Sequence, residues 1–317
     1  MNKHSAFFKN LITFASLMNS DIKTKFTGTG LALITPFTSN LSVDFPALER
    51  LIERGIKGGV EYLVVFGTTG EPITLSKPEK KEILEFVLKV NNKRLPVMIG
   101  LGGNNTIEVL ESIKFTNFSG VDGILSVCPY YNKPSQEGVY RHYVAIADAC
   151  PVPVMLYNIP GRTGINMSVN TILRLALHEN IIGVKEASGD LIQCMEIAKS
   201  APKEFLLIAG DDLLAVPMIA LGAKGSVAVL PNLFPDTFSD MVRFALNGDF
   251  INARRILYTF TELNPLLYAE GNPVGAKAVL KLMGICENFV RLPLAEASES
   301  LTASIEKVLN KLESVKV

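Results

Sequence analysis

The sequence repeats one structural unit from Gly30 onward. Each unit is a short run of β-branched and other apolar residues, then a turn, then a longer segment with apolar residues at helical spacing. The runs expected to be strands are Leu31–Thr35, Tyr62–Phe66, Pro96–Ile99, Gly123–Val127, Val154–Tyr157, Ile181–Lys185, Phe205–Ala209 and Ser226–Val229. The segments expected to be helices between them are Phe45–Lys57, Pro78–Asn91, Thr106–Phe118, Gln136–Ala149, Ser168–Leu177, Leu191–Ala198 and Leu213–Leu221. This alternation predicts an α/β fold, a closed (β/α)8 barrel of the TIM type.

The alternation stops near residue 248. After it, Phe250–Leu267, Pro273–Met283 and Leu301–Leu312 have helical spacing, so we expect a catalytic barrel over residues 26–248 and a C-terminal helical subdomain over 249–317. Residues 1–25 contain a short apolar run without a typical cleavage site and are expected to be a poorly ordered extension. An open doubly wound sheet would need fewer units and a glycine-rich turn after its first strand, which is absent.

Composition argues against several function classes. The 31 basic residues balance 31 acidic ones without a basic stripe, so neither nucleic acid nor a membrane surface is an expected partner. No uninterrupted apolar run reaches the length of about 18 residues that a membrane span needs. The cysteines are far apart and the histidines lack ligand spacing, which disfavours disulfides and zinc and fits a reducing cytoplasm. These counts do not exclude a magnesium ion bound by carboxylates.

Lys185 ends a run that is expected to be a buried strand. Ile181, Ile182 and Val184 are β-branched, and the period of two places Lys185 and Glu186 on opposite faces. The neighbouring carboxylate therefore does not neutralise the amine. A poorly solvated amine loses proton affinity and can form an imine with a ketone. The alternative is an ordinary lysine whose ammonium group reaches solvent or a carboxylate at the end of the strand, and this segment alone favours that alternative.

Polar residues also follow other strands, where a barrel assembles its chemistry. The segment Gly67-Thr68-Thr69-Gly70-Glu71 is a tight loop whose hydroxyls and N–H groups can hold a carboxylate or a phosphate, although an ordinary turn has the same composition. Tyr157 ends the strand next to that of Lys185, and Arg162 lies in the following loop. A phenol can transfer protons and a guanidinium can bind a carboxylate. These side chains are expected to converge on the amine.

The seventh and eighth strands are expected to supply small groups near the same amine. Gly210 offers backbone and Val227 offers a compact side chain. Asp211 and Asp212 follow directly, and we interpret them as helix caps in preference to catalytic acids.

The ordered motifs resemble those of the dihydrodipicolinate synthase family. They are Gly67-Thr-Thr-Gly-Glu71, Pro129-Tyr-Tyr-Asn132, Tyr157-Asn-Ile-Pro-Gly-Arg-Thr-Gly164, Gly183-Val-Lys-Glu186 and Gly210-Asp-Asp212. The similarity runs from about Phe26 to the C-terminus. It implies condensation of pyruvate with L-aspartate 4-semialdehyde through a lysine Schiff base, in lysine biosynthesis via diaminopimelate, without a metal or organic cofactor.

The resemblance also implies a role for each matching residue. Lys185 matches the Schiff-base lysine, and Tyr157 matches the proton donor and acceptor. Thr68 and Tyr131 match a proton relay in which the tyrosine comes from a neighbouring subunit, which requires at least a dimer. The resemblance implies a homotetramer built from dimers. The residues that match substrate-binding positions are Thr69 for the pyruvate carboxylate, Val227 and Gly210 for the pyruvate pocket, and Arg162 for the carboxylate of the aldehyde.

An allosteric lysine site is a further implication of the resemblance. Asn104, Glu108 and Tyr130 match its positions, but Lys77 and Lys80 stand where some lysine-inhibited members have histidines. Three other functions stay open: a pyruvate-dependent sugar-acid aldolase of the same fold, a non-catalytic barrel that binds a keto acid, and a metal-dependent barrel enzyme. Arg162 favours an aldehyde with a carboxylate over a sugar, and the reactive lysine is superfluous in a mere binder.

Overall fold

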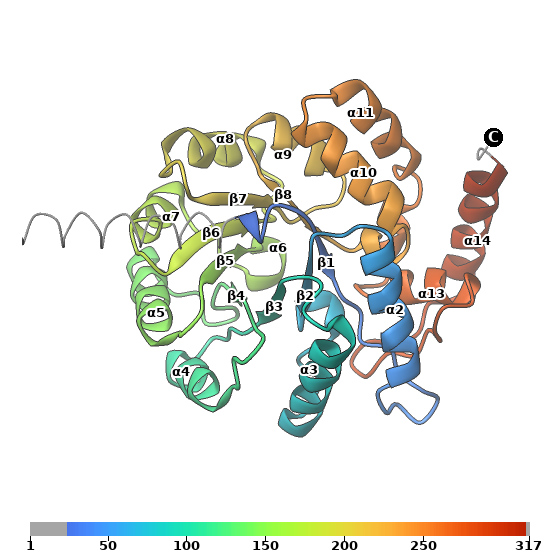
Figure 1. The fold of residues 1–317 in the computed structure, drawn as a ribbon, viewed down its shortest axis with the longest axis horizontal. Helices are drawn as coiled ribbons and strands as arrows, with labels where there is room; N and C mark the ends of the chain where they lie inside the picture. Colours follow the sequence, from blue (N-terminus) through green and yellow to red (C-terminus); the bar gives the residue numbers. More distant parts are fainter. Residues whose placement is uncertain (1–23, 315–317) are drawn as a thin grey trace, which may run out of the picture.

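A computed structural model describes residues 24–314 and contains a closed barrel of eight parallel strands (Figure 1). The strands are β1 (Gly28–Ala32), β2 (Tyr62–Val65), β3 (Val97–Gly100), β4 (Gly123–Val127), β5 (Val154–Asn158), β6 (Ile181–Glu186), β7 (Leu206–Ala209) and β8 (Gly225–Ala228). Each strand pairs with the next, and β1 pairs with β8. The predicted (β/α)8 barrel is confirmed.

The first strand begins earlier than the sequence pattern indicates. We expected Leu31–Thr35, but β1 is Gly28–Ala32. Gly30 packs against β2 so closely that a Cβ there would lie 2.5 Å from the ring of Tyr62. Glycine in a strand often marks such a close approach, and it also resembles a turn in the sequence. The apparent turn at the start of the run is therefore part of the strand.

The helices surround the strands, as Figure 1 shows. Those between successive strands are α2 (Phe45–Lys57), α3 (Lys77–Asn91), α4 (Thr106–Phe115), α5 (Gln136–Ala149), α6 (Pro160–Thr163), α7 (Val169–Leu175), α8 (Leu191–Ser200) and α9 (Ala215–Ala220). Two single turns of 3-10 helix, η1 (Thr68–Gly70) and η2 (Leu230–Asn232), follow β2 and β8. Of these elements, the sequence pattern predicted every α-helix except α6, with small differences at the ends.

An eighth barrel helix, α10 (Pro235–Leu246), was absent from the expected set. Its buried residues Phe238, Met241, Val242 and Ala245 have the spacing of a helix that packs against a sheet. Pro235 stands in the first turn, where a proline is tolerated. The helix closes the eighth unit of the barrel.

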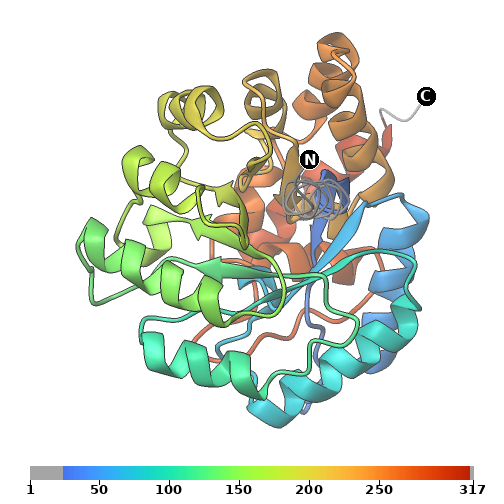
Figure 2. The same cartoon turned by 60° about the vertical axis from the view of Figure 1, so that its left-hand side comes forward.

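The C-terminal segment is helical, as predicted, but its first helix is divided. The expected helix Phe250–Leu267 is α11 (Phe250–Thr259) followed by α12 (Asn264–Tyr268). Pro265 lies in the first turn of α12, and because proline has no backbone N–H it cannot continue a preceding helix. The segment continues as α13 (Val274–Leu282) and α14 (Glu299–Ser314), and in Figure 2 the red part of the chain passes behind the strands. The division between barrel and subdomain at residue 248 stays a prediction.

The barrel interior is closed at one end by aromatic side chains. Phe26 and Tyr62 pack edge to face with ring centroids 5.4 Å apart, and both are fully buried. Above them the interior is lined by Val64, Met98 and Met155 together with other apolar residues. Residues 1–23 of the expected N-terminal extension lie outside the described residues. Of the helices in residues 24–314, none is long and apolar enough to cross a membrane.

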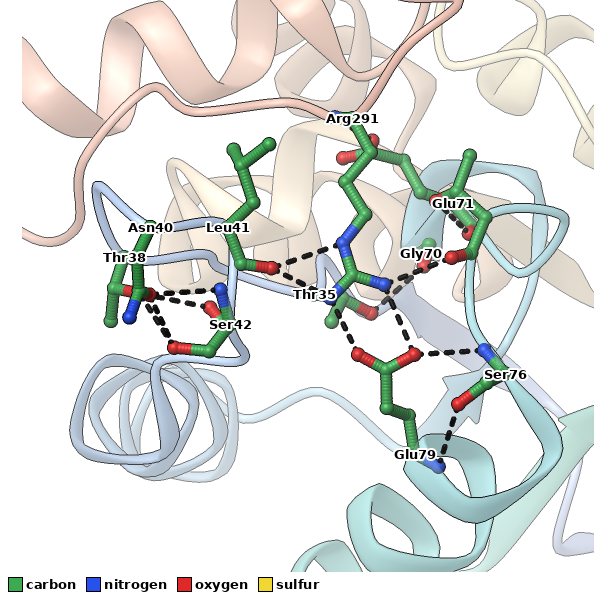
Figure 3. Close-up of polar contacts among 11 residues, drawn as sticks. Thr35, Thr38, Asn40, Leu41, Ser42, Gly70, Glu71, Ser76, Glu79 and Arg291 are labelled. Carbon is green, nitrogen blue, oxygen red and sulfur yellow. Dashed lines mark hydrogen bonds and ion pairs between the residues drawn. The ribbon is translucent and has the colours of Figure 1, made fainter.

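The loop after β2 is tied to the C-terminal segment by charged groups. The Arg291 guanidinium lies between the Glu79 carboxylate, 2.5 Å away, and the Leu41 carbonyl oxygen, 2.6 Å away (Figure 3). Hydrogen bonds from Arg291 lower the pKa of Glu79 to about 2. The backbone N–H of Arg291 donates to Glu71, whose carboxylate also pairs with Lys277 at 2.6 Å. These contacts hold the C-terminal segment against the carboxyl end of β2.

Candidate active site

Lys185 is buried near the carboxyl end of β6, with 7% of its surface exposed. Glu186 points to the opposite face, where its carboxylate accepts hydrogen bonds from Asn158 and Gln193. The alternation expected for this strand is thus observed. Within residues 24–314, no carboxylate forms an ion pair with the Lys185 amine. The alternative of a lysine neutralised by a carboxylate at the strand end is therefore not supported.

Tyr157 on β5 lies directly beside Lys185. The two residues are partners in the parallel ladder, and the lysine Nζ is 4.4 Å from the centroid of the tyrosine ring. Tyr157 is almost fully buried in the upper layer of the barrel interior. The amine therefore has a phenol as its immediate neighbour in the barrel interior.

A cavity of about 150 Å³ opens above this pair at the carboxyl ends of the strands. It brings together seven residues that the sequence had singled out: Thr68, Thr69, Tyr157, Arg162, Lys185, Gly210 and Val227. They come from the ends of five strands or the loops that follow them. The convergence of nucleophile, phenol, hydroxyls and guanidinium at one site agrees with the expectation for a barrel enzyme.

The loop after β2 is a tight turn whose backbone is constrained at both of its ends. Thr68, Thr69 and Gly70 form η1, and Thr69 is buried against the cavity. Thr35, which follows β1, donates a hydrogen bond to the Gly70 carbonyl oxygen at 2.8 Å. Phe66, the residue before the loop, has a positive φ of 61°, which directs the chain sharply away from the strand. The two threonines are thereby presented on a fixed backbone.

Gly210 leaves the space that the Lys185 side chain occupies. A Cβ at this position would lie 3.0 Å from Lys185 Cε and 2.7 Å from the Cβ of Ala187. The Gly210 N–H donates to the Glu186 carbonyl oxygen at 2.8 Å, which fixes β7 beside β6. Val227 on β8 is buried and also forms part of the cavity wall. A larger residue at position 210 would displace the amine.

Arg162 lies at the cavity mouth on the short helix α6. Its side chain is exposed, and among the residues that the structure describes no carboxylate pairs with it. A guanidinium in this position can bind a substrate carboxylate with two parallel hydrogen bonds.

A model of the dihydrodipicolinate synthetase family matches residues 25–312. The chain belongs to this family. The 4-hydroxy-tetrahydrodipicolinate synthase of Cytophaga hutchinsonii is 58% identical over 287 residues, which are 90% of this chain and 97% of that relative. The enzyme of the same name from Parabacteroides distasonis is 50% identical and covers 92% of this chain and 98% of its own length. The resemblance inferred from the motifs is confirmed.

Solved structures of the family have the same fold. The crystal structure of dihydrodipicolinate synthase from Aquifex aeolicus superposes with a TM-score of 0.87 at 40% identity, covering 91% of this chain and 98% of its own. Because the similarity includes the C-terminal helices, the family's whole architecture is present here.

Four residues that match family positions lie outside the cavity. Tyr131 is 88% exposed with a positive φ of 73°, so its ring projects from the surface. The amide of Asn132 donates to the Asn104 carbonyl oxygen at 2.9 Å, which joins the loop carrying Tyr130 and Tyr131 to the loop before α4. Glu108, on α4, accepts from the Asn105 amide at 3.1 Å. This surface is separate from the amine.

Asp212 is not a helix cap, contrary to our interpretation. It is buried, and its carboxylate accepts from the backbone N–H groups of Val229 and Leu230 and from the side chains of Asn264 and Tyr268. Burial raises its pKa to about 6, but all four partners are donors, so the carboxylate is ionised at neutral pH. Its neighbour Asp211 does accept from two N–H groups before α9.

Two residues that line the cavity are not indicated by any pattern in the sequence. Tyr268 and Asn272 both come from the C-terminal segment. The Tyr268 hydroxyl donates to Asp212 at 3.0 Å, and the Asn272 amide donates to the Thr69 hydroxyl at 3.0 Å. Asn272 is 203 residues from Thr69 along the chain, and Tyr268 is 56 residues from Asp212. No local pattern therefore connects either residue to its partner. The C-terminal helices therefore contribute one wall of the site.

Proposed function

We propose that Lys185 is the residue on which this chain carries out the 4-hydroxy-tetrahydrodipicolinate synthase reaction. The activity is that of its relatives, a Schiff-base-forming condensation of pyruvate with L-aspartate 4-semialdehyde in lysine biosynthesis via diaminopimelate. The observation that carries the residue assignment is the buried Lys185 amine, 4.4 Å from the Tyr157 ring centroid and without a carboxylate partner in residues 24–314. A buried amine beside a phenol at the wall of a cavity is suited to attack a ketone.

The first half of the reaction builds a nucleophile from pyruvate. The Lys185 nitrogen attacks the ketone carbon, and the resulting carbinolamine loses water to give a protonated imine. Tyr157 donates the proton that the departing oxygen needs. The positive nitrogen then acidifies the methyl group, and loss of one methyl proton gives an enamine. No metal or organic cofactor is required by these steps.

The second half forms the carbon–carbon bond and releases the enzyme. The enamine carbon attacks the aldehyde carbon of L-aspartate 4-semialdehyde, and the alkoxide takes up a proton. The substrate's own amine then attacks the imine carbon, closes the ring and displaces the Lys185 nitrogen. Holding both substrates in one cavity replaces a collision in solution by a reaction between fixed neighbours.

The remaining cavity residues divide between the two substrates. Thr69 donates to the pyruvate carboxylate, while Gly210 and Val227 form the wall around the three-carbon chain. Arg162, free of carboxylate partners in the described residues, receives the carboxylate of the semialdehyde at the mouth. A sugar aldehyde presents only hydroxyl groups there, so Arg162 supports the semialdehyde over a sugar-acid aldolase reaction.

The exposed tyrosine fits a site completed between subunits. Tyr131 is 88% exposed, and we assign it to a relay with Thr68 in which it enters the cavity of a neighbouring chain. A homotetramer made of two such dimers, located in the cytoplasm, is the assembly that we propose. Asn104, Glu108 and Tyr130 lie beside this contact, and we assign to them the binding of lysine as an allosteric ligand.

A substrate panel tests the function directly. Purified protein is expected to consume pyruvate with L-aspartate 4-semialdehyde and to be far slower with aldehydes of neutral sugars. The measurement is pyruvate consumption with each aldehyde at equal concentration. Rapid consumption with a sugar aldehyde and none with the semialdehyde would transfer the chain to the aldolase branch, and binding of pyruvate without turnover would identify a keto-acid-binding barrel.

Replacing Tyr157 with phenylalanine is expected to slow turnover by about 100-fold or more, since a positioned proton-transfer group typically contributes that much. The ring that packs beside Lys185 remains, so the thermal unfolding midpoint should change little. Steady-state kinetics and circular dichroism provide the two measurements. Tyr140→Phe is a matched control, because that ring packs against the Arg174 guanidinium and is not among the residues that line the cavity. Unchanged kinetics in Tyr157→Phe would remove the residue from the mechanism.

A further inference from the structure

The hydroxyl of Thr69 is oriented by a residue from the far end of the chain. The Asn272 side-chain amide donates a hydrogen bond to Thr69 Oγ1 at 3.0 Å. An amide NH2 group only donates, so the threonine oxygen is the acceptor in this contact. The hydroxyl hydrogen of Thr69 must then point elsewhere, and in residues 24–314 no acceptor for it is present. Both residues line the cavity, so this hydrogen is available to a ligand there.

The position of Asn272 is set by the turn between α12 and α13. Gly271 has a φ of 103°, and its N–H donates to the Tyr268 carbonyl oxygen. The Val274 N–H in turn donates to the Gly271 carbonyl oxygen at 2.9 Å. A residue with a Cβ would be strained at this φ, so the turn requires glycine. Asn272 is therefore carried by a defined turn and not by an open loop.

The same segment also fixes the loop two residues after Thr69. Lys277 on α13 is fully buried and pairs with the Glu71 carboxylate at 2.6 Å, and the Arg291 N–H donates to the same carboxylate at 3.1 Å. Thr69 and Glu71 are thus both held by the C-terminal segment. Their relative position depends on the C-terminal segment, and so does the direction of the Thr69 hydroxyl.

We propose that Asn272 is a positioning residue for substrate binding, which acts by directing the Thr69 hydroxyl hydrogen toward the carboxylate of pyruvate. The inference rests on the proposed function, in which Thr69 receives that carboxylate. Asn272 is neutral and donates, so it leaves the anion site free of negative charge. A carboxylate at position 272 would reverse the hydrogen bond, because it accepts the Thr69 hydrogen, and would repel the substrate anion.

Asn272→Asp is the sharpest test, since the two side chains have nearly the same size. The KM for pyruvate is expected to rise about 10-fold or more, because the variant loses the hydrogen bond from the Thr69 hydroxyl to the charged carboxylate of the substrate. The kcat at saturating pyruvate should fall much less, as Lys185 and Tyr157 are unaltered. Borohydride trapping at saturating pyruvate should still label the variant in full, which excludes loss of the folded site. A wild-type KM in Asn272→Asp overturns the inference.

A double-mutant cycle separates action through Thr69 from direct contact with the substrate. Asn272→Ala is expected to raise the KM for pyruvate in the wild-type background and to add little in Thr69→Val, where there is no hydroxyl to orient. Equal effects in both backgrounds would show that Asn272 does not act through Thr69. Asn288→Asp is the matched control, because Asn288 lies in the same segment and, among the side chains of the part of the chain that the structure describes, bonds only to the exposed Lys281.

The outcome can be separated from that of the proposed function. If the wild-type protein neither condenses pyruvate with the semialdehyde nor forms the trapped adduct, the proposed function fails. If the wild type does both while every Asn272 variant retains its KM, only the positioning role fails.

Discussion

Lys185→Ala is expected to abolish both the condensation of pyruvate with L-aspartate 4-semialdehyde and the pyruvate adduct that borohydride traps on the wild-type protein. Reduction of the imine joins the three-carbon unit permanently to the lysine nitrogen, and alanine has no nitrogen to join. Turnover should fall by a factor on the order of 10⁴ or more, since losing a covalent nucleophile can cost up to about 10⁶. Intact mass before and after reduction measures the adduct.

Two controls make this result specific. Lys185→Arg keeps a positive charge in the cavity but provides no imine-forming amine, so it should be as inactive as the alanine variant. Lys224→Ala removes an exposed lysine just before β8, at the opposite end of the barrel from the site, and should label and turn over like the wild type. An alanine variant at position 185 that still acquires the adduct in full yield would place the reactive amine elsewhere.

The expectation for Lys185 could be formed from sequence because local rules determine its surroundings. The β-branched run predicts the strand, the period of two separates the lysine from Glu186, and barrel geometry predicts that Tyr157 on the neighbouring strand ends beside it. Their pairing in the ladder confirms that geometry. Arg162 and the two threonines are found in the same way, since each follows a strand of the barrel.

Contacts between segments far apart in sequence could not be predicted in this way. Nothing near Asn272 indicates that its amide bonds to Thr69, and nothing near Lys277 indicates a partner at Glu71. Asp212 looks like a helix cap because it precedes a helix, but its partners lie at two distant places in the chain, the turn after β8 and α12. Tyr131 is a different case, because the contact that we propose for it is with another chain. These residues depend on how the whole chain packs.

Lys277→Met is expected to lower the free energy of unfolding by about 3–5 kcal/mol, because it leaves the buried Glu71 carboxylate without its cation. In the native protein both side chains are almost fully buried, and Lys277 also donates to the Phe289 carbonyl oxygen at 2.8 Å. Burial lowers the pKa of Lys277. The thermal midpoint should fall by roughly 10 °C, as measured by calorimetry. Lys281→Met is the matched control on α13, where the lysine pairs with an exposed glutamate, and should change stability by less than about 1 kcal/mol.

The double variant Lys277→Met with Glu71→Gln distinguishes an unpaired charge from lost packing. Glutamine keeps an acceptor for the Arg291 N–H but carries no charge, so the double variant should be more stable than Lys277→Met alone. If the losses in free energy of unfolding caused by Lys277→Met and by Glu71→Gln simply add in the double variant, the lysine contributes through packing and not by neutralising Glu71. Because Glu71 directly follows the loop of Thr68 and Thr69, Lys277→Met should also raise the KM for pyruvate at temperatures well below its unfolding midpoint. A destabilised variant with a wild-type KM would mean that the ion pair supports the fold without orienting the threonine loop.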